Sequence, residues 1–152
     1  MNDKSKAPNF LGLIDENNQI SLSDYKGSFL VLYFYPKDKT SGCTIQSQDF
    51  RDYKKKFANK NCKIIGISRD SIKSHKSFTE KESLNFPLIS DPDETMCNAY
   101  GVMKEKSMYG RKYMGIDRST FVIDPDGNLI KEWRGVKVPG HVEEVYNFIC
   151  EL

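Results

Sequence analysis

Cys43 is the residue whose surroundings in the sequence are best suited to chemistry. An unbroken apolar run over residues 29–35 stops at Pro36, and a polar turn over 37–42 leads into Cys43. The apolar residues that follow recur at a roughly helical spacing, namely Ile45, Phe50, Tyr53 and Phe57. This pattern predicts a buried strand, a tight turn and a helix that carries Cys43 in its first turn.

A cysteine in the first turn of a helix is suited to nucleophilic chemistry. The thiolate is the reactive form of cysteine, and the free N–H groups and the dipole at a helix N-terminus stabilise negative charge. The competing interpretation of Cys43 is a small buried apolar residue. Its neighbours Thr40 and Ser41 are polar, and Gly42 has no side chain. We therefore expect an open turn and a reactive thiolate at Cys43.

The spacing around Cys43 also matches a known motif. Pro36, Thr40 and Cys43 form the pattern Pro-x3-Thr-x2-Cys. This pattern resembles the peroxidatic signature of the peroxiredoxins, and the surrounding YFYPKDKTSGCT is similar to the branch called bacterioferritin comigratory protein, or Q-type. The motif is specific because it fixes three residue types at set spacings. The resemblance extends from the APNF segment near the start to the last predicted helix.

Length and charge restrict the classes of function. The 152 residues are enough for one domain, 1–152, with a substantial core. The formal net charge of +2 gives no electrostatic argument for binding nucleic acid or an anionic membrane. No stretch is long and apolar enough to span a membrane, and the first residues have no apolar signal-peptide core. A cytoplasmic location is therefore expected, where a reactive cysteine is more often catalytic than structural.

The other residues that bind metals or carry redox chemistry are scattered along the chain. None of the cysteines forms a Cys-x-x-Cys pair, which argues against a thioredoxin-type dithiol and a zinc ribbon. His75 and His141 stand beside no cysteine or carboxylate at ligand spacing, so each is expected to be an ordinary helix or helix-cap residue. No Gly-rich phosphate loop is present. We therefore expect no metal and no organic cofactor. The cysteines are Cys43, Cys62, Cys97 and Cys150.

The remaining pattern predicts strands that alternate with helices. Residues 8–27 alternate apolar and polar side chains around 15–18, which predicts an N-terminal hairpin. Residues 102–117 have no clear period and are interpreted as an active-site loop. Further strands are predicted at 29–35, 62–68, 86–90, 119–124 and 128–135. Helices are predicted at 43–60, at 72–84, after Asp91, and at 141–152, the last with Val142, Val145, Ile149 and Leu152 facing inward.

This order of elements indicates an α/β domain of three layers with a central mixed sheet. The peroxiredoxin resemblance implies the thioredoxin-like fold for the same elements. A reactive thiolate also needs a lasting positive charge nearby, and an arginine suits this because it stays protonated and offers several fixed donors. From the sequence alone, Arg118 is interpreted as a surface arginine paired with Asp117. The resemblance changes this interpretation, because an arginine in a GIxRxTF-like context lies over the peroxidatic cysteine in the family.

The resemblance implies a thiol-dependent peroxidase that reduces hydrogen peroxide and organic hydroperoxides. The Cys43 thiolate would attack one peroxide oxygen and become a sulfenic acid. Arg118 and the N–H of Cys43 would hold the two oxygens. The Thr40 hydroxyl would hydrogen-bond in the same pocket, and Pro36 would shield the thiolate from water and end the strand.

The sequence leaves more than one route by which the sulfenic acid could be reduced back to the thiol. Many relatives in this branch carry a resolving cysteine where this chain has Gln48, and others carry one in the next helix, near 78–79, where this chain has none. The hypothesis is a one-cysteine cycle, in which thioredoxin or a glutaredoxin-type thiol attacks the sulfenic acid. The alternative is a two-cysteine cycle with Cys97 as the resolving residue. Cys62 is expected to be buried, and Cys150 lacks the context of an inter-subunit resolving cysteine.

Two other classes of function remain as alternatives. One is a redox sensor or chaperone-like protein in which Cys43 oxidises once without turnover. The other is a thiol–disulfide oxidoreductase, against which the missing Cys-x-x-Cys pair argues. The expected oligomeric state is a monomer or a weak dimer.

Overall fold

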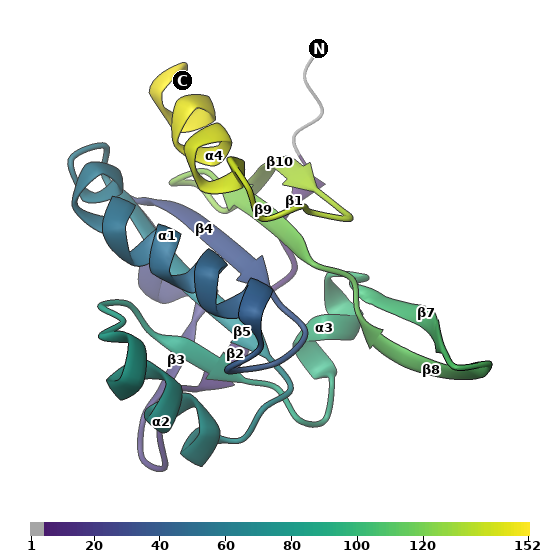
Figure 1. Ribbon diagram of the computed structural model, residues 1–152. Helices are drawn as coiled ribbons and strands as arrows, with labels where there is room; N and C mark the ends of the chain where they lie inside the picture. The colour runs from purple at the N-terminus through teal and green to yellow at the C-terminus, as the bar shows by residue number, and fades with distance from the viewer. Residues whose placement is uncertain (1–4) are drawn as a thin grey trace.

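The computed structural model describes residues 5–152 (Figure 1). The first four residues, which belong to the segment where no signal-peptide core is expected, lie outside the described part. The strands are β1 Ser5–Lys6, β2 Leu11–Leu13, β3 Gln19–Ser21, β4 Phe29–Phe34, β5 Cys62–Ser68, β6 Leu88–Ser90, β7 Met103–Met108, β8 Arg111–Ile116, β9 Ser119–Ile123 and β10 Asn128–Trp133. The helices are η1 Leu22–Tyr25, α1 Ser41–Ala58, α2 Ile72–Glu82, α3 Thr95–Ala99 and α4 His141–Cys150.

Eight strands form one mixed sheet in the order β1-β10-β9-β4-β5-β6-β2-β3. Strand β4 lies at its centre, parallel to β5 and antiparallel to β9. The predicted hairpin is β2–β3, which joins the edge of the sheet through β6. The mixed α/β architecture predicted from the order of the elements is therefore confirmed.

The side chains of β4 alternate between two apolar cores, one on each face of the sheet. Helices α1, α2 and α4 cover the first face, and α3 and η1 lie against the second (Figure 1). The side chains directed to the first core are Val31, Tyr33 and, directly after the end of the strand, Tyr35. Those directed to the second are Leu30, Leu32 and Phe34. All six are fully buried, which explains why this strand appears in the sequence as an unbroken apolar run.

Helix α1 buries one stripe of its surface against the sheet and α4. Phe50 and Phe57 are fully buried on this stripe, together with Gln46 and Ser47. Ile45, which was expected to belong to the same apolar pattern, is 51% exposed. It stands five residues before Phe50, and at about 100° per residue this places the two side chains roughly 140° apart around the helix.

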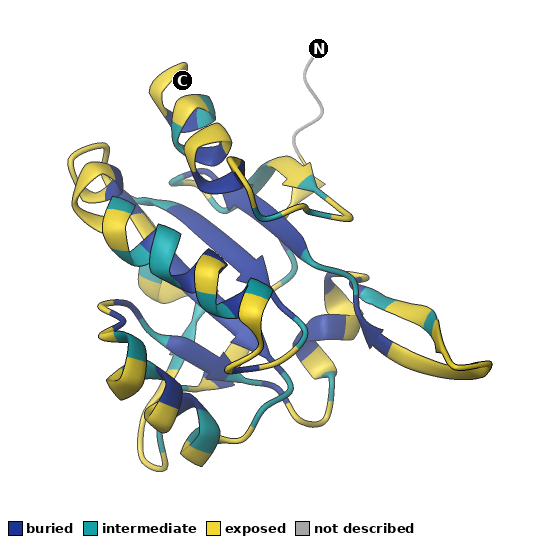
Figure 2. Ribbon diagram, in the orientation of Figure 1, coloured by how far each residue is buried: buried dark blue, intermediate teal, exposed yellow. Residues whose placement is uncertain are grey.

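Residues 102–117 do not form the loop that their sequence indicates. They form β7 and β8, an antiparallel two-stranded sheet that projects from the body of the molecule (Figure 1). Both sides of this hairpin are largely exposed (Figure 2). Without a buried side the strands have no reason to alternate apolar and polar residues, so the period of two is absent from the sequence.

The last helix is shorter than expected. It ends at Cys150, and Leu152 is 59% exposed instead of facing inward. Val142, Val145 and Ile149 are buried as predicted. Over residues 5–152, no helix has the length and apolar character needed to cross a membrane.

Candidate active site

Cys43 lies near the start of helix α1, which follows the central strand in the chain. Strand β4 ends at Phe34, a turn of six residues follows, and Cys43 is the third residue of the helix. The first backbone bond that closes the helix runs from the N–H of Thr44 to the carbonyl of Thr40, at 2.9 Å. The N–H groups before Thr44, including that of Cys43, therefore have no acceptor within the helix. The predicted strand, turn and helix are confirmed.

The Cys43 side chain is buried, which differs from the expected open turn. It is only 1% exposed and belongs to the core on the α1 face of the sheet. The neighbouring residues Thr40 and Ser41 are exposed. The exposed residues of the turn thus lie at the surface while the thiol points inward and has almost no contact with solvent.

Arg118 brings a permanent positive charge to the thiol. Its Nη2 donates to the Sγ of Cys43 at 3.4 Å, and its Nη1 donates to the Oε1 of Gln46 at 2.6 Å. Arg118 directly precedes β9, and Ser119 of that strand pairs with Phe34 at the end of β4. The interpretation as a surface arginine paired with Asp117 is therefore wrong, because the guanidinium faces Cys43 and Gln46.

Gln46 is a site residue that was not expected from the sequence. It is completely buried, and its Nε2 has no hydrogen-bond partner among the described residues. The available signal was its place three residues after Cys43, which puts both on one face of the helix. Gly42 also leaves room for the arginine, since a Cβ at this position would lie 3.3 Å from the Nη2 of Arg118.

Pro36 and Thr40 lie in the turn, as the motif predicts. Pro36 is half-buried and is the second residue after the end of the central strand. Thr40 is the N-cap residue of α1, but its hydroxyl donates to the carbonyl of Lys37 at 2.8 Å instead of capping the helix. This bond closes the turn on itself. It leaves the oxygen lone pairs of the Thr40 hydroxyl available to an N–H or O–H donor.

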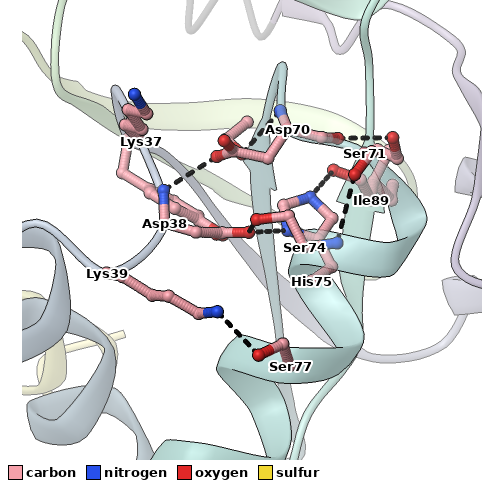
Figure 3. Close-up of polar contacts among 12 residues, drawn as sticks. Lys37, Asp38, Lys39, Asp70, Ser71, Ser74, His75, Ser77 and Ile89 are labelled. Carbon is pink, nitrogen blue, oxygen red and sulfur yellow. Dashed lines mark hydrogen bonds and ion pairs between the residues drawn. The ribbon is translucent and has the colours of Figure 1, made fainter.

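A cluster of largely buried polar side chains, Asp38, Asp70 and His75, contacts the same turn (Figure 3). Asp38 accepts hydrogen bonds from Tyr35 at 2.6 Å and from Ser74 at 2.8 Å, and its Oδ2 lies 2.7 Å from the Nδ1 of His75. The expectation that His75 stands beside no carboxylate is therefore wrong. Asp38 is in the turn and His75 is in α2, so their proximity arises only in the folded chain.

Asp38, Asp70 and His75 also have the types and proximity of metal ligands, with one ligand atom of each within 4.8 Å of the others. Their polar atoms, however, already bond to protein groups. Asp70 accepts from the hydroxyl of Ser68 at 2.6 Å and from the backbone N–H of Asp38 at 2.8 Å. The distances are those of hydrogen bonds. The cluster is thus built as a hydrogen-bonded network.

Two of the other cysteines, Cys62 and Cys97, lie in surroundings that disfavour a thiolate. Cys62 is buried at the start of β5, as expected, and burial raises the pKa of its thiol to about 12. The pKa of Cys97 is also raised, first by burial and then by its hydrogen bond with Asp91. Cys97 belongs to the core on the face of the sheet opposite to that of Cys43. Cys150 is exposed at the end of α4.

Comparison with known proteins agrees with this geometry. Residues 4–132 match the AhpC/TSA family. The chain is 50% identical over 147 residues to peroxiredoxin Bcp of Bacillus subtilis, covering 97% of this chain and 94% of that protein. It is 49% identical over 140 residues to a protein of Coxiella burnetii named as a peroxiredoxin of the same kind, covering 92% and 93% of the two chains.

Solved structures give the same result. A cysteine-to-serine variant of peroxiredoxin Q from Xylella fastidiosa superposes with a TM-score of 0.92 at 42% identity, covering 99% of this chain and 96% of that one. The bacterioferritin comigratory protein of Xanthomonas campestris superposes with a TM-score of 0.89 at 43% identity, covering 93% and 90%. The chain therefore has the thioredoxin-like fold and belongs to the AhpC/TSA family, in the Bcp or Q branch of the peroxiredoxins, which are thiol peroxidases.

Proposed function

We propose that this protein reduces hydrogen peroxide and organic hydroperoxides with Cys43 as the peroxidatic thiol. The observation that supports this assignment is the contact of 3.4 Å between Arg118 Nη2 and Cys43 Sγ in the first turn of α1. The thiolate sulfur attacks one peroxide oxygen, and the O–O bond breaks as the S–O bond forms. The second oxygen leaves with the bonding electron pair as hydroxide or alkoxide, and Cys43 becomes a sulfenic acid.

The neighbouring groups have distinct roles in this proposal. Arg118 and the free N–H of Cys43 stabilise the charge that moves from sulfur to the leaving oxygen. Gln46 accepts a hydrogen bond from Arg118 and so orients the guanidinium toward the sulfur. The Thr40 hydroxyl accepts a hydrogen bond from the peroxide, and Pro36 keeps water from the thiolate. The chain acts as a single domain, 1–152, in the cytoplasm, as a monomer or weak dimer.

The proposed route of recycling is a one-cysteine cycle. An external thiol, from thioredoxin or a glutaredoxin-type reductant, attacks the sulfenic sulfur and forms a mixed disulfide while the S–O bond breaks and the oxygen leaves as water. A second thiol then attacks this disulfide and releases Cys43 as the thiol. Cys97 is a poor resolving residue in the folded protein, because it is fully buried and packs on the opposite face of the sheet. At position 48 the chain has a glutamine, whose Nε2 donates to Glu82 Oε1 at 2.7 Å.

The test is peroxide consumption with NADPH, thioredoxin reductase and thioredoxin, comparing wild type, Cys43→Ser and Cys97→Ser. We expect Cys43→Ser to have no activity and Cys97→Ser to keep full turnover. Loss of turnover in both variants, with a Cys43–Cys97 disulfide in the mass spectrum of peroxide-treated wild type, would establish the two-cysteine cycle instead. A wild type that oxidises once and is not recycled by thioredoxin or by a glutaredoxin-type thiol would be a sensor and would contradict the peroxidase proposal.

A further inference from the structure

The turn that leads to Cys43 is attached to helix α2 by a buried pair of residues. Asp38 is 5% exposed and His75 is 2% exposed, and they join the turn to a helix that begins more than thirty residues later. Figure 3 shows His75 between Asp38 on one side and the carbonyl of Ile89 on the other. The ring Nδ1 is 2.7 Å from Asp38 Oδ2, and the Nε2 is 3.0 Å from Ile89 O.

These two contacts restrict which atoms of the His75 ring can carry protons when Asp38 is ionised. A backbone carbonyl oxygen can only accept a hydrogen bond, so the Nε2 of His75 carries a proton. An ionised carboxylate is also only an acceptor, so the Nδ1 facing Asp38 carries a second proton. A ring with protons on both nitrogens is the imidazolium cation. With Asp38 ionised, the contact between His75 and Asp38 is that of an ion pair shielded from water.

The surroundings of Asp38 favour the ionised form of its carboxyl group. Burial acts to raise the pKa of Asp38, but the hydrogen bonds and charge of His75 and the hydroxyls of Tyr35 and Ser74 outweigh it, so the pKa lies below its usual value. Asp38 is therefore ionised at neutral pH. The same contacts tie the turn to Tyr35 at the end of the central strand and to Ser74 and His75 of α2.

The turn needs such support because its backbone is strained. Lys39, between Asp38 and the N-cap Thr40, has a φ of 67°, a left-handed conformation that is unfavourable for a residue with a side chain. Asp38 also donates its backbone N–H to Asp70 Oδ2 at 2.8 Å. The strained residue is thus held on one side by the anchored Asp38 and on the other by the first turn of α1, which carries Cys43.

We propose that the His75 imidazolium is a positioning residue for peroxide reduction, acting through Asp38 to hold the turn that places Cys43 against Arg118. The proposal rests on the proposed role of Cys43 as the peroxidatic thiol. His75 does not touch the reacting atoms in this assignment. Its contribution is to keep the sulfur in line with the guanidinium, since a displacement of the order of 1 Å costs about a hundredfold in rate.

The test compares two reactions of Cys43 in His75→Gln, Asp38→Asn and the double variant. Peroxide reduction requires the aligned sulfur and guanidinium, whereas alkylation by iodoacetamide requires only an accessible thiolate. We expect each single variant to react with hydrogen peroxide about 10- to 100-fold more slowly, with the alkylation rate unchanged or increased. The double variant should be no slower than Asp38→Asn, because His75 acts through Asp38.

Ser77→Ala is the matched control. It removes the exposed contact of 2.6 Å from Lys39 Nζ to Ser77 Oγ, which joins the same turn to the same helix (Figure 3). We expect this control to leave both rates unchanged. Equal losses in both reactions, or a normal peroxide rate in folded His75→Gln, would overturn the proposal. Wild-type Cys43 reacting with peroxide no faster than free cysteine would instead contradict the proposed function.

A spectroscopic measurement on the wild-type protein tests the same proposal without a variant, and so remains available if the variants fail to fold. The nitrogen chemical shifts of the His75 ring distinguish imidazolium from either neutral tautomer. We expect both ring nitrogens to be protonated at neutral pH. A neutral ring would show that no ion pair exists and would overturn the proposal.

Discussion

At the scale of single residues, the reactivity proposed for Cys43 depends on a small number of oriented contacts. The thiol is nearly inaccessible to water, and the Arg118 guanidinium lies against its sulfur. Gln46 accepts a hydrogen bond from that guanidinium through its oxygen, and its buried Nε2 has no partner within residues 5–152. A buried donor without a partner is costly, so this N–H is suited to a hydrogen bond with an entering peroxide oxygen.

Replacement of Arg118 by methionine tests the role of the guanidinium. We expect the rate constant for oxidation of Cys43 by hydrogen peroxide to fall by about 10²- to 10³-fold, the usual effect of removing one oriented donor from a developing negative charge. Arg118→Lys should recover only part of this loss, because a single ammonium cannot bond Gln46 and Cys43 in the same geometry. Stopped-flow measurement of the peroxide reaction provides the rate constants.

Arg111→Met, which removes an exposed arginine from β8, is the control for the change of charge in that experiment. Its rate constant should match that of the wild type. A normal rate in Arg118→Met would contradict the assignment of Arg118.

At the scale of elements, the hairpin β7–β8 is connected to the site through its base. Lys106 of β7 donates to the carbonyl of Ile116 at 2.6 Å, two residues before Arg118. Burial lowers the pKa of Lys106, and the nearby Arg118 and Arg69 act in the same direction against the opposing effect of Asp117. The hairpin therefore projects into solvent and also contacts the chain next to the site. The Lys106 contact ties it to the segment from which the arginine extends.

Lys106→Met should loosen this segment without unfolding the protein. We expect the peroxide rate constant to fall by at most about tenfold, the scale of one hydrogen bond from a charged group. The matched variant is Lys104→Met, on the same face of the same strand but exposed, and it should keep the wild-type rate. Equal rates in the two variants would show that the Lys106 contact does not support Arg118.

At the scale of the whole molecule, the central sheet separates the two cores and with them the cysteines. Cys43 packs on the side of α1, α2 and α4, while Cys97 packs behind the sheet. The sheet also joins the two edges of the site, because β4 and β9 are direct neighbours. Helix α4 is attached to this framework by His141, whose Nε2 lies 2.8 Å from the hydroxyl of Thr120 in β9.

His141 should make the stability of the fold depend on pH. Burial lowers its pKa below the usual value near 6.5, although Glu144 acts in the opposite direction. Since the unfolded chain takes up the proton first as the pH falls, this contribution to stability is complete above about pH 6.5 and is lost below it. Urea unfolding at pH 7.5 and 5.5 should therefore show a larger loss of stability in wild type than in His141→Gln. An equal loss of stability in wild type and in His141→Gln would show that His141 is not the source of this pH dependence.

The sequence by itself determined the parts of this protein that depend on local pattern. The apolar run of β4, the turn after Pro36 and the helix that begins ahead of Cys43 could be predicted because strand, turn and helix have their own periods and boundary residues. The same local spacing of Pro36, Thr40 and Cys43 carried the resemblance to the peroxiredoxins. The hairpin β7–β8 lacks a buried side, so its sequence shows no period of two. The prediction of a loop there was wrong.

Only the tertiary structure decided which distant side chains meet. Arg118 lies 75 positions after Cys43 and His75 lies 37 positions after Asp38, and no local period connects residues so far apart. The first contact depends on the order and register of the strands, which place β9 beside β4. The second depends on the packing of α2 against the turn. The burial of Cys43 was settled in the same way, because exposure depends on what packs against a residue and not on the polarity of its neighbours in the chain.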